Sequence, residues 1–521
     1  MLYPISFDHL FQINFHQFIE DIEAITIFKT CKRTYYRNYP CYKFKDRYSV
    51  KVFLACMQSR LSTNRFIPAL VHLFGEILGD SDVDALAKAL EMNKSVTTLD
   101  LENAIEDCLP LTEKIGASGA SSLAKALSVN KSVTTLNLSS NNIKDLGTTS
   151  LAKALEVNKS VTTLNLFYNR IEDSGASSLA KTLELNNTLT RIDFRGNLLG
   201  DTGVSALAKA LQMNKTVTTI DLGVNKIGAL GAYSLAQALE TNKTMTTIDL
   251  DHNRIRDLGA SSLAKALKVN RNVIAVDLSH NQIGDSGISS LAEALEVNQS
   301  VIAMNLYGNS IGSSGVISLA TALEVNEIVT AINLGCNELG DLGACSLAKA
   351  LELNQKLSII YLEYNVIGVS GISSLAKALQ VNKSLTEINL RGNHIRIAGI
   401  SLLAKALKVN KTVTIFDLGA NGIGNVGASL LAEALELNNT ITTINLQLNQ
   451  IEDLGAASLS KALRVNNTVT DMNLLSNKIG DLIKSSIMKA LEMNKKMAPI
   501  QRSKKCNELM CNTYSLKSHW P

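Results

Sequence analysis

The chain has 521 residues, of which 46% are hydrophobic, with a mean hydropathy of +0.10 and a formal net charge of +4. Hydrophobic content this high excludes a disordered chain, and so small a charge over this length indicates neither nucleic-acid nor membrane binding. No apolar run approaches about 18 residues and no charged-then-apolar leader opens the sequence. We therefore expect a cytoplasmic protein that does not span a membrane.

Residues 1–70 differ in composition from the rest, because fifteen of the 24 Phe and Tyr residues lie before position 75. Pro4, Leu10, Ile13 and the run at 18–33, F-I-E-D-I-E-A-I-T-I-F-K-T-C-K-R, resemble an F-box, a helical module that docks onto ubiquitin-ligase adaptors. The resemblance implies that residues 1–45 bind such an adaptor, with residues 46–70 as a connector. The alternative is an aromatic helical cap that covers the first repeat of the array that follows.

From Leu136 to beyond Met472 the sequence repeats every 28 residues without insertion or deletion, in thirteen copies, each marked by one Asn such as Asn141. A period of about 20 to 50 residues indicates a solenoid, whose repeats bury their apolar sides against their neighbours. Less regular copies extend the array to residues 71–500, about fifteen repeats in all. The spacing from Leu99 to Leu136 is 37 residues, and the excess around 103–112 predicts a bulging loop.

Each repeat combines a strand with a helix. In the copy at 161–188, Leu164 and Leu166 alternate with Asn165 as in a strand, and the apolar positions 176, 179, 180 and 183 form one helical stripe. We expect Gly175 in a tight turn before the helix, where a residue without Cβ is needed. We expect Asn186 to end the helix in the left-handed conformation that Asn tolerates.

Repeated strand–helix units produce a parallel sheet with all helices on one face. Strands stack about 4.8 Å apart whereas packed helices need about 8–10 Å, so the array must curve. We predict an α/β solenoid shaped as a horseshoe, with a parallel inner sheet, outer helices and a small α-helical N-terminal segment. A closing helix is expected at 484–494, followed by a basic, disordered tail at 501–521.

The pattern L-x-L-x-x-N-x-I-x-x-x-G-x-x-x-L-A-x-A-L, from Leu136 to Leu155, resembles a known class of leucine-rich repeat. Ribonuclease inhibitor, the Ran GTPase-activating proteins and the nucleotide-binding leucine-rich-repeat immune receptors carry this class. The repeat sequence A-L-E-V-N-K-S-V-T-T-L-N-L is most similar to the repeats of these receptors. The chain, however, contains no G-x-x-x-x-G-K-[ST] nucleotide-binding loop. The resemblance implies the fold, whereas function depends on sites that vary among such proteins.

No catalytic residues are identified, and we expect no enzymatic activity and no cofactor. The eight cysteines contain no C-x-x-C pair, which indicates reduced thiols and argues against structural zinc. His252 and His280 occupy the same column of adjacent strands, about 5 Å apart, near Asp249 and Asp277. A metal site there is one interpretation; we favour a solvated polar face and predict no metal.

The predicted inner face has one constant column and several variable ones. Between the two leucines of each strand, twelve of thirteen copies have Asn or Asp, and the exception is Tyr361. The following columns vary, and exposed aromatic residues and arginines are typical anchors of protein interfaces. We predict a non-enzymatic interaction scaffold that binds a protein partner on its concave face through Phe167, Tyr168, Arg195, Asp251, His252, His280, Tyr307, Tyr361, Glu363, Tyr364 and Arg391.

Two alternative functions follow from the resemblances. One is a substrate receptor of a ubiquitin ligase, in which residues 1–45 dock the ligase and the repeats select the substrate. The other is a GTPase-activating protein, by resemblance to the Ran regulators, although those carry an acidic tail and this tail is basic, with Arg502, Lys504, Lys505 and Lys517.

Overall fold

The computed structural model describes residues 70–72, 78–103 and 114–497, with side chains from residue 78 onward. The predicted F-box-like segment at 1–45, the connector up to residue 69, the loop at 104–113 and the tail at 501–521 lie outside the described residues. The described chain forms two compact units, an N-terminal unit that ends at Asn305 and a C-terminal unit that begins at Leu306.

The N-terminal unit contains a parallel sheet of three-residue strands that lie in chain order. The strands are β1 (Leu70–His72), β2 (Thr98–Asp100), β3 (Thr135–Asn137), β4 (Thr163–Asn165), β5 (Arg191–Asp193), β6 (Thr219–Asp221), β7 (Thr247–Asp249), β8 (Ala275–Asp277) and β9 (Ala303–Asn305). The register confirms the repeat, because Leu164 pairs with Ile192 and Leu99 pairs with Leu136 across the longer copy.

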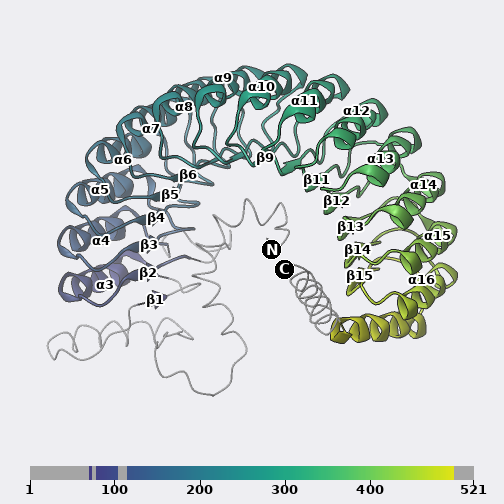
Figure 1. Cartoon of the computed structure of the whole chain (residues 1–521). Coiled ribbons are helices and arrows are strands. Elements are labelled where there is room, and N and C mark those ends of the chain that lie inside the picture. Colours follow the sequence, from purple (N-terminus) through teal and green to yellow (C-terminus); the bar gives the residue numbers. More distant parts are fainter. Residues whose placement is uncertain (1–69, 73–77, 104–113, 498–521) are drawn as a thin grey trace, which may run out of the picture. The chain divides into compact units, whose positions relative to one another are not determined.

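One helix follows each of the first eight strands of this unit. The helices are α3 (Asp80–Met92), α4 (Ala117–Val129), α5 (Lys144–Val157), α6 (Asp173–Leu185), α7 (Asp201–Met213), α8 (Ala229–Thr241), α9 (Arg256–Val269) and α10 (Asp285–Val297). The strands lie on the inner side of the unit and the helices on its outer side (Figure 1).

The C-terminal unit repeats this arrangement. Its strands are β10 (Ala331–Asn333), β11 (Ile359–Tyr361), β12 (Glu387–Asn389), β13 (Ile415–Asp417), β14 (Thr443–Asn445) and β15 (Asp471–Asn473). Its helices are α11 (Ser313–Val325), α12 (Gly340–Leu353), α13 (Val369–Val381), α14 (Arg396–Val409), α15 (Gly424–Leu437) and α16 (Asp453–Val465). Each unit curves with its strands inside, which confirms the predicted α/β solenoid (Figure 1).

A last helix covers the end of the core, as predicted. It begins at residue 481, three residues before the expected start, and is described to residue 497. Ile487 and Ala490 are buried on its inner face, and the side-chain amide of Asn494 donates to the carbonyls of Asn466 and Val469. In the described part of the chain, no helix combines the length and the apolar character that crossing a lipid bilayer requires.

The asparagine that marks each repeat joins its own turn to the preceding repeat by hydrogen bonds. Asn253 is buried, and its amide donates to the carbonyl oxygens of Asp251, of Leu250 and of Leu222 in the preceding repeat. Its Oδ1 accepts the N–H of Ile227, also in the preceding repeat, at 3.0 Å. Buried backbone groups without partners are costly, so this side chain fixes both its own turn and the stacking of the repeats.

The asparagine that ends each helix has a different role from the predicted one. Asn186 has φ −85° and ψ 123°, so it is extended and not left-handed. Its amide donates to the Leu155 carbonyl of the preceding repeat at 2.7 Å, and its Oδ1 accepts the N–H groups of Thr188 and Leu189. The prediction of a left-handed cap was therefore wrong, since this position requires the amide side chain itself.

Gly175 also departs from the prediction, because it is the third residue of α6 and does not lie in a loop. A β-carbon there would lie 2.6 Å from Asp145 Oδ1 and 2.7 Å from Ile171 Cγ2. Asp145, in the first turn of α5, accepts the N–H groups of Glu172 and Gly175 and so caps the next helix. The glycine is thus required by the close approach of the neighbouring repeat.

Candidate functional site

One column of residues on the inner edge of the repeats has a left-handed backbone throughout. We call the residue immediately before each repeat-marking Asn the left-handed column. All thirteen of its members have φ between 48° and 69°: Ser140, Tyr168, Gly196, Val224, His252, His280, Gly308, Cys336, Tyr364, Gly392, Ala420, Leu448 and Ser476. Only three are glycine, although a side chain in this conformation costs about 1–2 kcal/mol.

The sequence analysis did not find this conformation, because its members share no residue type. The signal was their fixed place before the Asn, combined with the three glycines. Six of the thirteen positions carry Tyr, His, Val or Leu, including the β-branched Val224, for which a positive φ is a clear outlier. Four predicted partner-binding residues, Tyr168, His252, His280 and Tyr364, belong to it.

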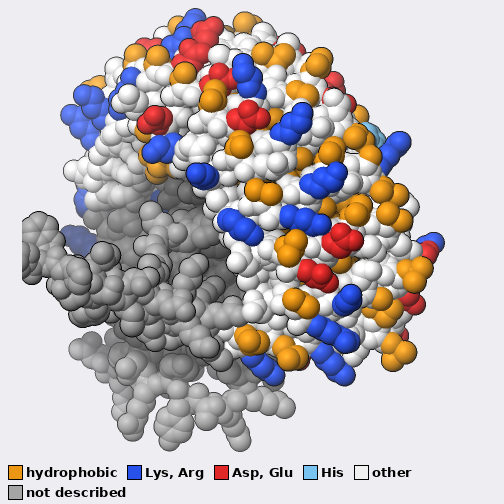
Figure 2. Space-filling view, turned by 45° about the vertical axis from the view of Figure 1, so that its right-hand side comes forward, with side chains coloured by type: hydrophobic (Ala, Val, Ile, Leu, Met, Phe, Trp, Pro, Cys, Tyr) orange, Lys and Arg blue, Asp and Glu red, His pale blue; other side chains and the backbone are white. Residues whose placement is uncertain are grey.

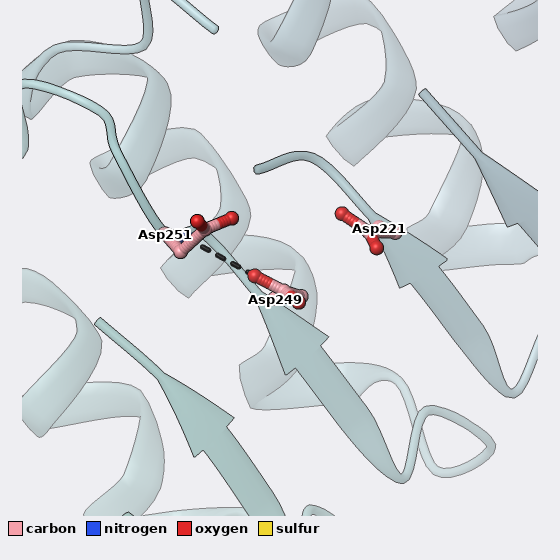
Figure 3. Close-up of side chains that lie close together, drawn as sticks. All are labelled: Asp221, Asp249 and Asp251. Atoms are coloured by element: carbon pink, nitrogen blue, oxygen red, sulfur yellow. Dashed lines mark hydrogen bonds between the residues drawn. The ribbon is translucent and has the colours of Figure 1, made fainter. Parts of the chain in front are cut away.

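In the N-terminal unit, three carboxylates meet where strands β6 and β7 end (Figure 3). Asp221 is the last residue of β6, Asp249 is the last residue of β7, and Asp251 follows two residues later. One carboxylate oxygen from each lies within 4.8 Å of the other two. We call Asp221, Asp249 and Asp251 the acidic cluster.

Basic side chains surround one edge of the acidic cluster. The guanidinium of Arg195 donates to Asp251 Oδ2 at 3.1 Å, across the intervening repeat, and His252 Nδ1 lies 2.7 Å from the same oxygen. The rings of His252 and His280 lie 3.9 Å apart, which agrees with the predicted approach of the two histidines. The structure therefore brings together four predicted site residues of this unit: Arg195, Asp251, His252 and His280.

Much of the polar column between the leucines is buried here, including Asp277 of the predicted solvated face, whereas Asp249 and His280 of that face are partly exposed and His252 is exposed. Asp193, Asp221 and Asp277 are all buried beneath the inner surface. Burial, together with repulsion from neighbouring carboxylates, raises the pKa of Asp221 and Asp249 well above the ordinary value. Burial also raises the pKa of Asp193 and of Asp277 to about 6. Neighbouring repeats cover these carboxylates, because strand stacking leaves little room between side chains of one column.

Phe167 and Tyr168 form a separate aromatic pair in the same unit. Their ring centroids lie 5.8 Å apart, and Tyr168 is exposed. A β-carbon on Gly196, the next member of the left-handed column, would come within 3.0 Å of Tyr168 and 3.1 Å of Phe167. The absence of a side chain at Gly196 thus makes room for this pair.

In the C-terminal unit, Tyr364 and Arg391 form the corresponding cluster. Tyr364 is 45% exposed, and its hydroxyl accepts a hydrogen bond from Arg391 Nε at 3.0 Å. Arg391 also donates from a terminal nitrogen to Gln447 Oε1 at 3.0 Å, two repeats further on. The ring of Tyr364 lies over Gly392, where a β-carbon would overlap it. We call Tyr364, Arg391 and Gln447 the tyrosine–arginine cluster.

Three predicted anchors of this unit are not exposed. Tyr361 is only 8% exposed and donates its hydroxyl to Glu387 Oε1 at 2.6 Å, and Glu363 is 9% exposed. Tyr307 is partly buried and accepts a hydrogen bond from the Cys336 thiol at 2.8 Å, and burial raises its pKa. Asp251, in the N-terminal unit, is buried as well. The expectation that Asp251, Tyr361 and Glu363 are exposed on the inner face was therefore wrong. Their neighbours in the stacked repeats cover them.

The outer face offers a more uniform surface. The last residue of each helix in the C-terminal unit is an exposed apolar residue: Val325, Leu353, Val381, Val409, Leu437 and Val465. On this face apolar, basic and acidic side chains are interspersed without one dominant patch (Figure 2). A series that is the same in every repeat does not define one binding position, whereas the inner columns differ from repeat to repeat.

The family model described as Leucine Rich repeat matches ten segments of the chain. They are residues 129–152, 157–180, 185–208, 214–236, 241–264, 269–292, 325–348, 381–404, 409–432 and 437–460. Together with the parallel strands and alternating helices, these matches make the chain a leucine-rich-repeat protein. Proteins built from such repeats serve as protein-interaction scaffolds.

Solved structures with similarity to this chain include an internalin and a part of leiomodin-1. An internalin from Listeria monocytogenes is 19% identical, covers 81% of this chain and 94% of its own, and superposes with a TM-score of 0.44. The actin-binding site 2 of leiomodin-1 is 15% identical, covers 42% of this chain and 95% of its own, and has a TM-score of 0.23. No curated protein sequence matches the chain.

Proposed function

We propose that this protein is a non-enzymatic scaffold that holds a protein partner on the inner face of its repeats. The left-handed column is the observation that carries the proposal. Three repeats have glycine in it, so the fold accepts the residue that removes the backbone cost, yet others retain Tyr, His and Leu. Residues kept in a costly conformation are characteristic of binding sites.

The tyrosine–arginine cluster is the proposed anchor. Tyrosine and arginine contribute most of the energy in many protein interfaces, and here each holds the other in place. Tyr364 also rests against Gly392, so its ring is ordered before a partner arrives. We propose a cytoplasmic location as well, because Cys336 and Cys345, the two cysteines within the described residues, are both unpaired.

The substitution Tyr364→Gly separates binding from folding. It removes the proposed anchor and the left-handed strain together, so the folded chain should be at least as stable as the parent while partner capture falls at least tenfold. The matched control is Ala420→Gly, which relieves φ +52° in the same column but removes only a methyl group. Affinity purification with the full chain, quantified for each captured protein, measures the effect.

The opposite result would assign the function to the outer face. Lys349 lies on α12, with 75% of its side chain exposed, and forms only a long 3.8 Å ion pair with Glu324. If Lys349→Glu abolishes capture while Tyr364→Gly leaves it intact, the inner face is not the binding surface and the proposal fails.

A further inference from the structure

The acidic cluster contains carboxylate oxygens that the protein itself leaves without a hydrogen bond. Asp221 Oδ1 accepts the N–H of Gly223 at 3.0 Å, whereas its Oδ2 is buried and has no partner. Asp251 Oδ2 accepts from Arg195 and lies beside His252 Nδ1, whereas its Oδ1 is also buried without a partner. Asp221 is 3% exposed and Asp251 is 5% exposed, so bulk water does not solvate these oxygens.

Each carboxylate of the cluster uses one oxygen for a hydrogen bond to another group of the protein. One oxygen orients the side chain through a bond to the protein, and in Asp249 this is Oδ1, which accepts the Asp251 N–H at 3.1 Å. The other oxygen of Asp221 and of Asp251 has nothing to bond to. A buried acceptor without a donor costs about 1–3 kcal/mol, so two such oxygens in one cluster point to a bound ligand.

Gly223 makes room for the carboxylate of Asp251. A β-carbon on Gly223 would overlap Asp251 Oδ1 and would lie 3.3 Å from Asp221 Oδ1. In Figure 3, Asp221 points toward the side on which Asp249 and Asp251 lie. Any other residue at position 223 would occupy the site where the unpartnered oxygen of Asp251 now lies.

The charges around the cluster are not balanced. Five carboxylates, those of Asp193, Asp221, Asp249, Asp251 and Asp277, interact with one another on this face. Two guanidiniums, those of Arg191 and Arg195, act on them. The carboxylates therefore outnumber the guanidiniums, and a bound divalent cation would favour the ionised form of the carboxylates.

We propose that Asp221, Asp249 and Asp251 bind a divalent cation of the calcium class, each through one carboxylate oxygen. The three oxygens lie within 4.8 Å of one another, which is close enough for all three to reach one cation at calcium–oxygen distances of roughly 2.4 Å. Carboxylate ligands favour a hard cation, and water would complete the coordination. The proposal concerns a ligand of the N-terminal unit and is independent of partner binding by the tyrosine–arginine cluster.

The test uses the full chain, treated with chelator and then titrated with CaCl2, MgCl2 or MnCl2 in a calorimeter. Calcium should bind with a stoichiometry of one per cluster and raise the melting temperature in a saturable manner. Asp221→Asn and Asp249→Asn should abolish both effects. Their cation-free forms should melt no lower than the parent, because an amide removes a buried, repelled carboxylate.

Asp417→Asn is the matched control, because Asp417 occupies the same column of the repeat in the C-terminal unit. Its neighbours in that column are the amides Asn389 and Asn445, and Asn445 already donates to Asp417 Oδ2 at 2.7 Å. This variant should bind calcium as the parent does. The proposal is overturned if the parent binds no divalent cation at millimolar concentration, or if Asp221→Asn and Asp417→Asn change binding equally.

Discussion

The ring of Tyr364 lies directly over Gly392 in the next repeat, and both residues have a left-handed backbone. A positive φ is unfavourable for Tyr364. Its ring fits only because Gly392 has no β-carbon. Gly196 stands in the same relation to Tyr168 in the N-terminal unit. Placement of aromatic side chains on the inner edge therefore depends on the residue one repeat later.

This relationship predicts that Gly392→Ala is more harmful than an equivalent glycine substitution elsewhere. Gly392 and Gly422 both have φ +65°, but nothing lies within 4 Å of a β-carbon on Gly422. Gly422→Ala should cost about 1–2 kcal/mol in free energy of unfolding from the backbone alone. Gly392→Ala should cost about 1–3 kcal/mol more, because it overlaps the tyrosine ring.

Chemical denaturation of the two alanine variants measures the difference. In a Tyr364→Gly background, the excess cost of Gly392→Ala should disappear, because the ring is no longer present. Equal costs at positions 392 and 422 would contradict the contact.

The repeat-marking asparagines should be intolerant of apolar replacement. Asn253→Leu removes the donor to Leu222, Leu250 and Asp251 and the acceptor for the Ile227 N–H. The free energy of unfolding should fall by about 1–3 kcal/mol, because buried backbone groups lose their partners. Asn142→Leu is the comparison, since Asn142 Oδ1 has no hydrogen-bond partner. A denaturation midpoint for Asn253→Leu equal to that of the parent would exclude this role.

The helix-ending asparagines offer a direct test between the two explanations of their occurrence. If Asn186 were present to allow a left-handed backbone, Asn186→Gly would be tolerated or would stabilise the protein. The structure predicts a loss of about 1–3 kcal/mol, because the amide bridges Leu155 of the preceding repeat to Thr188 and Leu189. Thermal melts of the glycine variant that match the parent would restore the capping explanation.

The solenoid could be predicted from the sequence because the features that define it recur in every copy. The register of Leu164 with Ile192 follows from the 28-residue period, and burial of the leucines follows from alternation. The roles of Gly175 and Asn186 could not be predicted in the same way. Each is determined by a side chain or carbonyl of the preceding repeat, Asp145 and Leu155, which a single copy does not contain.

The candidate site was less predictable for a related reason. Arg195, Asp251, His252 and His280 were identified by residue type, and the structure brings them together. Which of them is exposed depends on neighbours one or two repeats away, such as Gly223 beneath Asp251. Residue type alone therefore predicted exposure for Asp251, which is buried.

The buried carboxylates of the inner face should make stability depend on pH. The pKa of Asp193 is raised to about 6, chiefly by burial, and Arg191 and Arg195 only partly offset this effect, while Asp221 and Asp251 lie nearby with like charge. In the unfolded chain this carboxyl titrates near 3.9. Below about pH 4 both states are protonated and Asp193 costs nothing. As pH rises from about 4 to 6, ionisation favours the unfolded state, and stability is lost.

Asp193→Asn should remove this loss of stability and should leave the free energy of unfolding below about pH 4 unchanged. Relative to the parent in chelator, the variant should gain about 1–3 kcal/mol between pH 4 and pH 7, as expected for a shift of roughly two pKa units in a buried group. Asp84→Asn is the opposite control, because hydrogen bonds from Lys88 and Ser122 lower the pKa of exposed Asp84. The stabilisation that ionised Asp84 provides is present at neutral pH and is lost as pH falls. The free energy of unfolding of Asp84→Asn should therefore not rise relative to the parent between pH 4 and pH 7. Denaturant unfolding at several pH values measures both, and a pH-independent difference for Asp193→Asn would show that this carboxyl is not perturbed by burial.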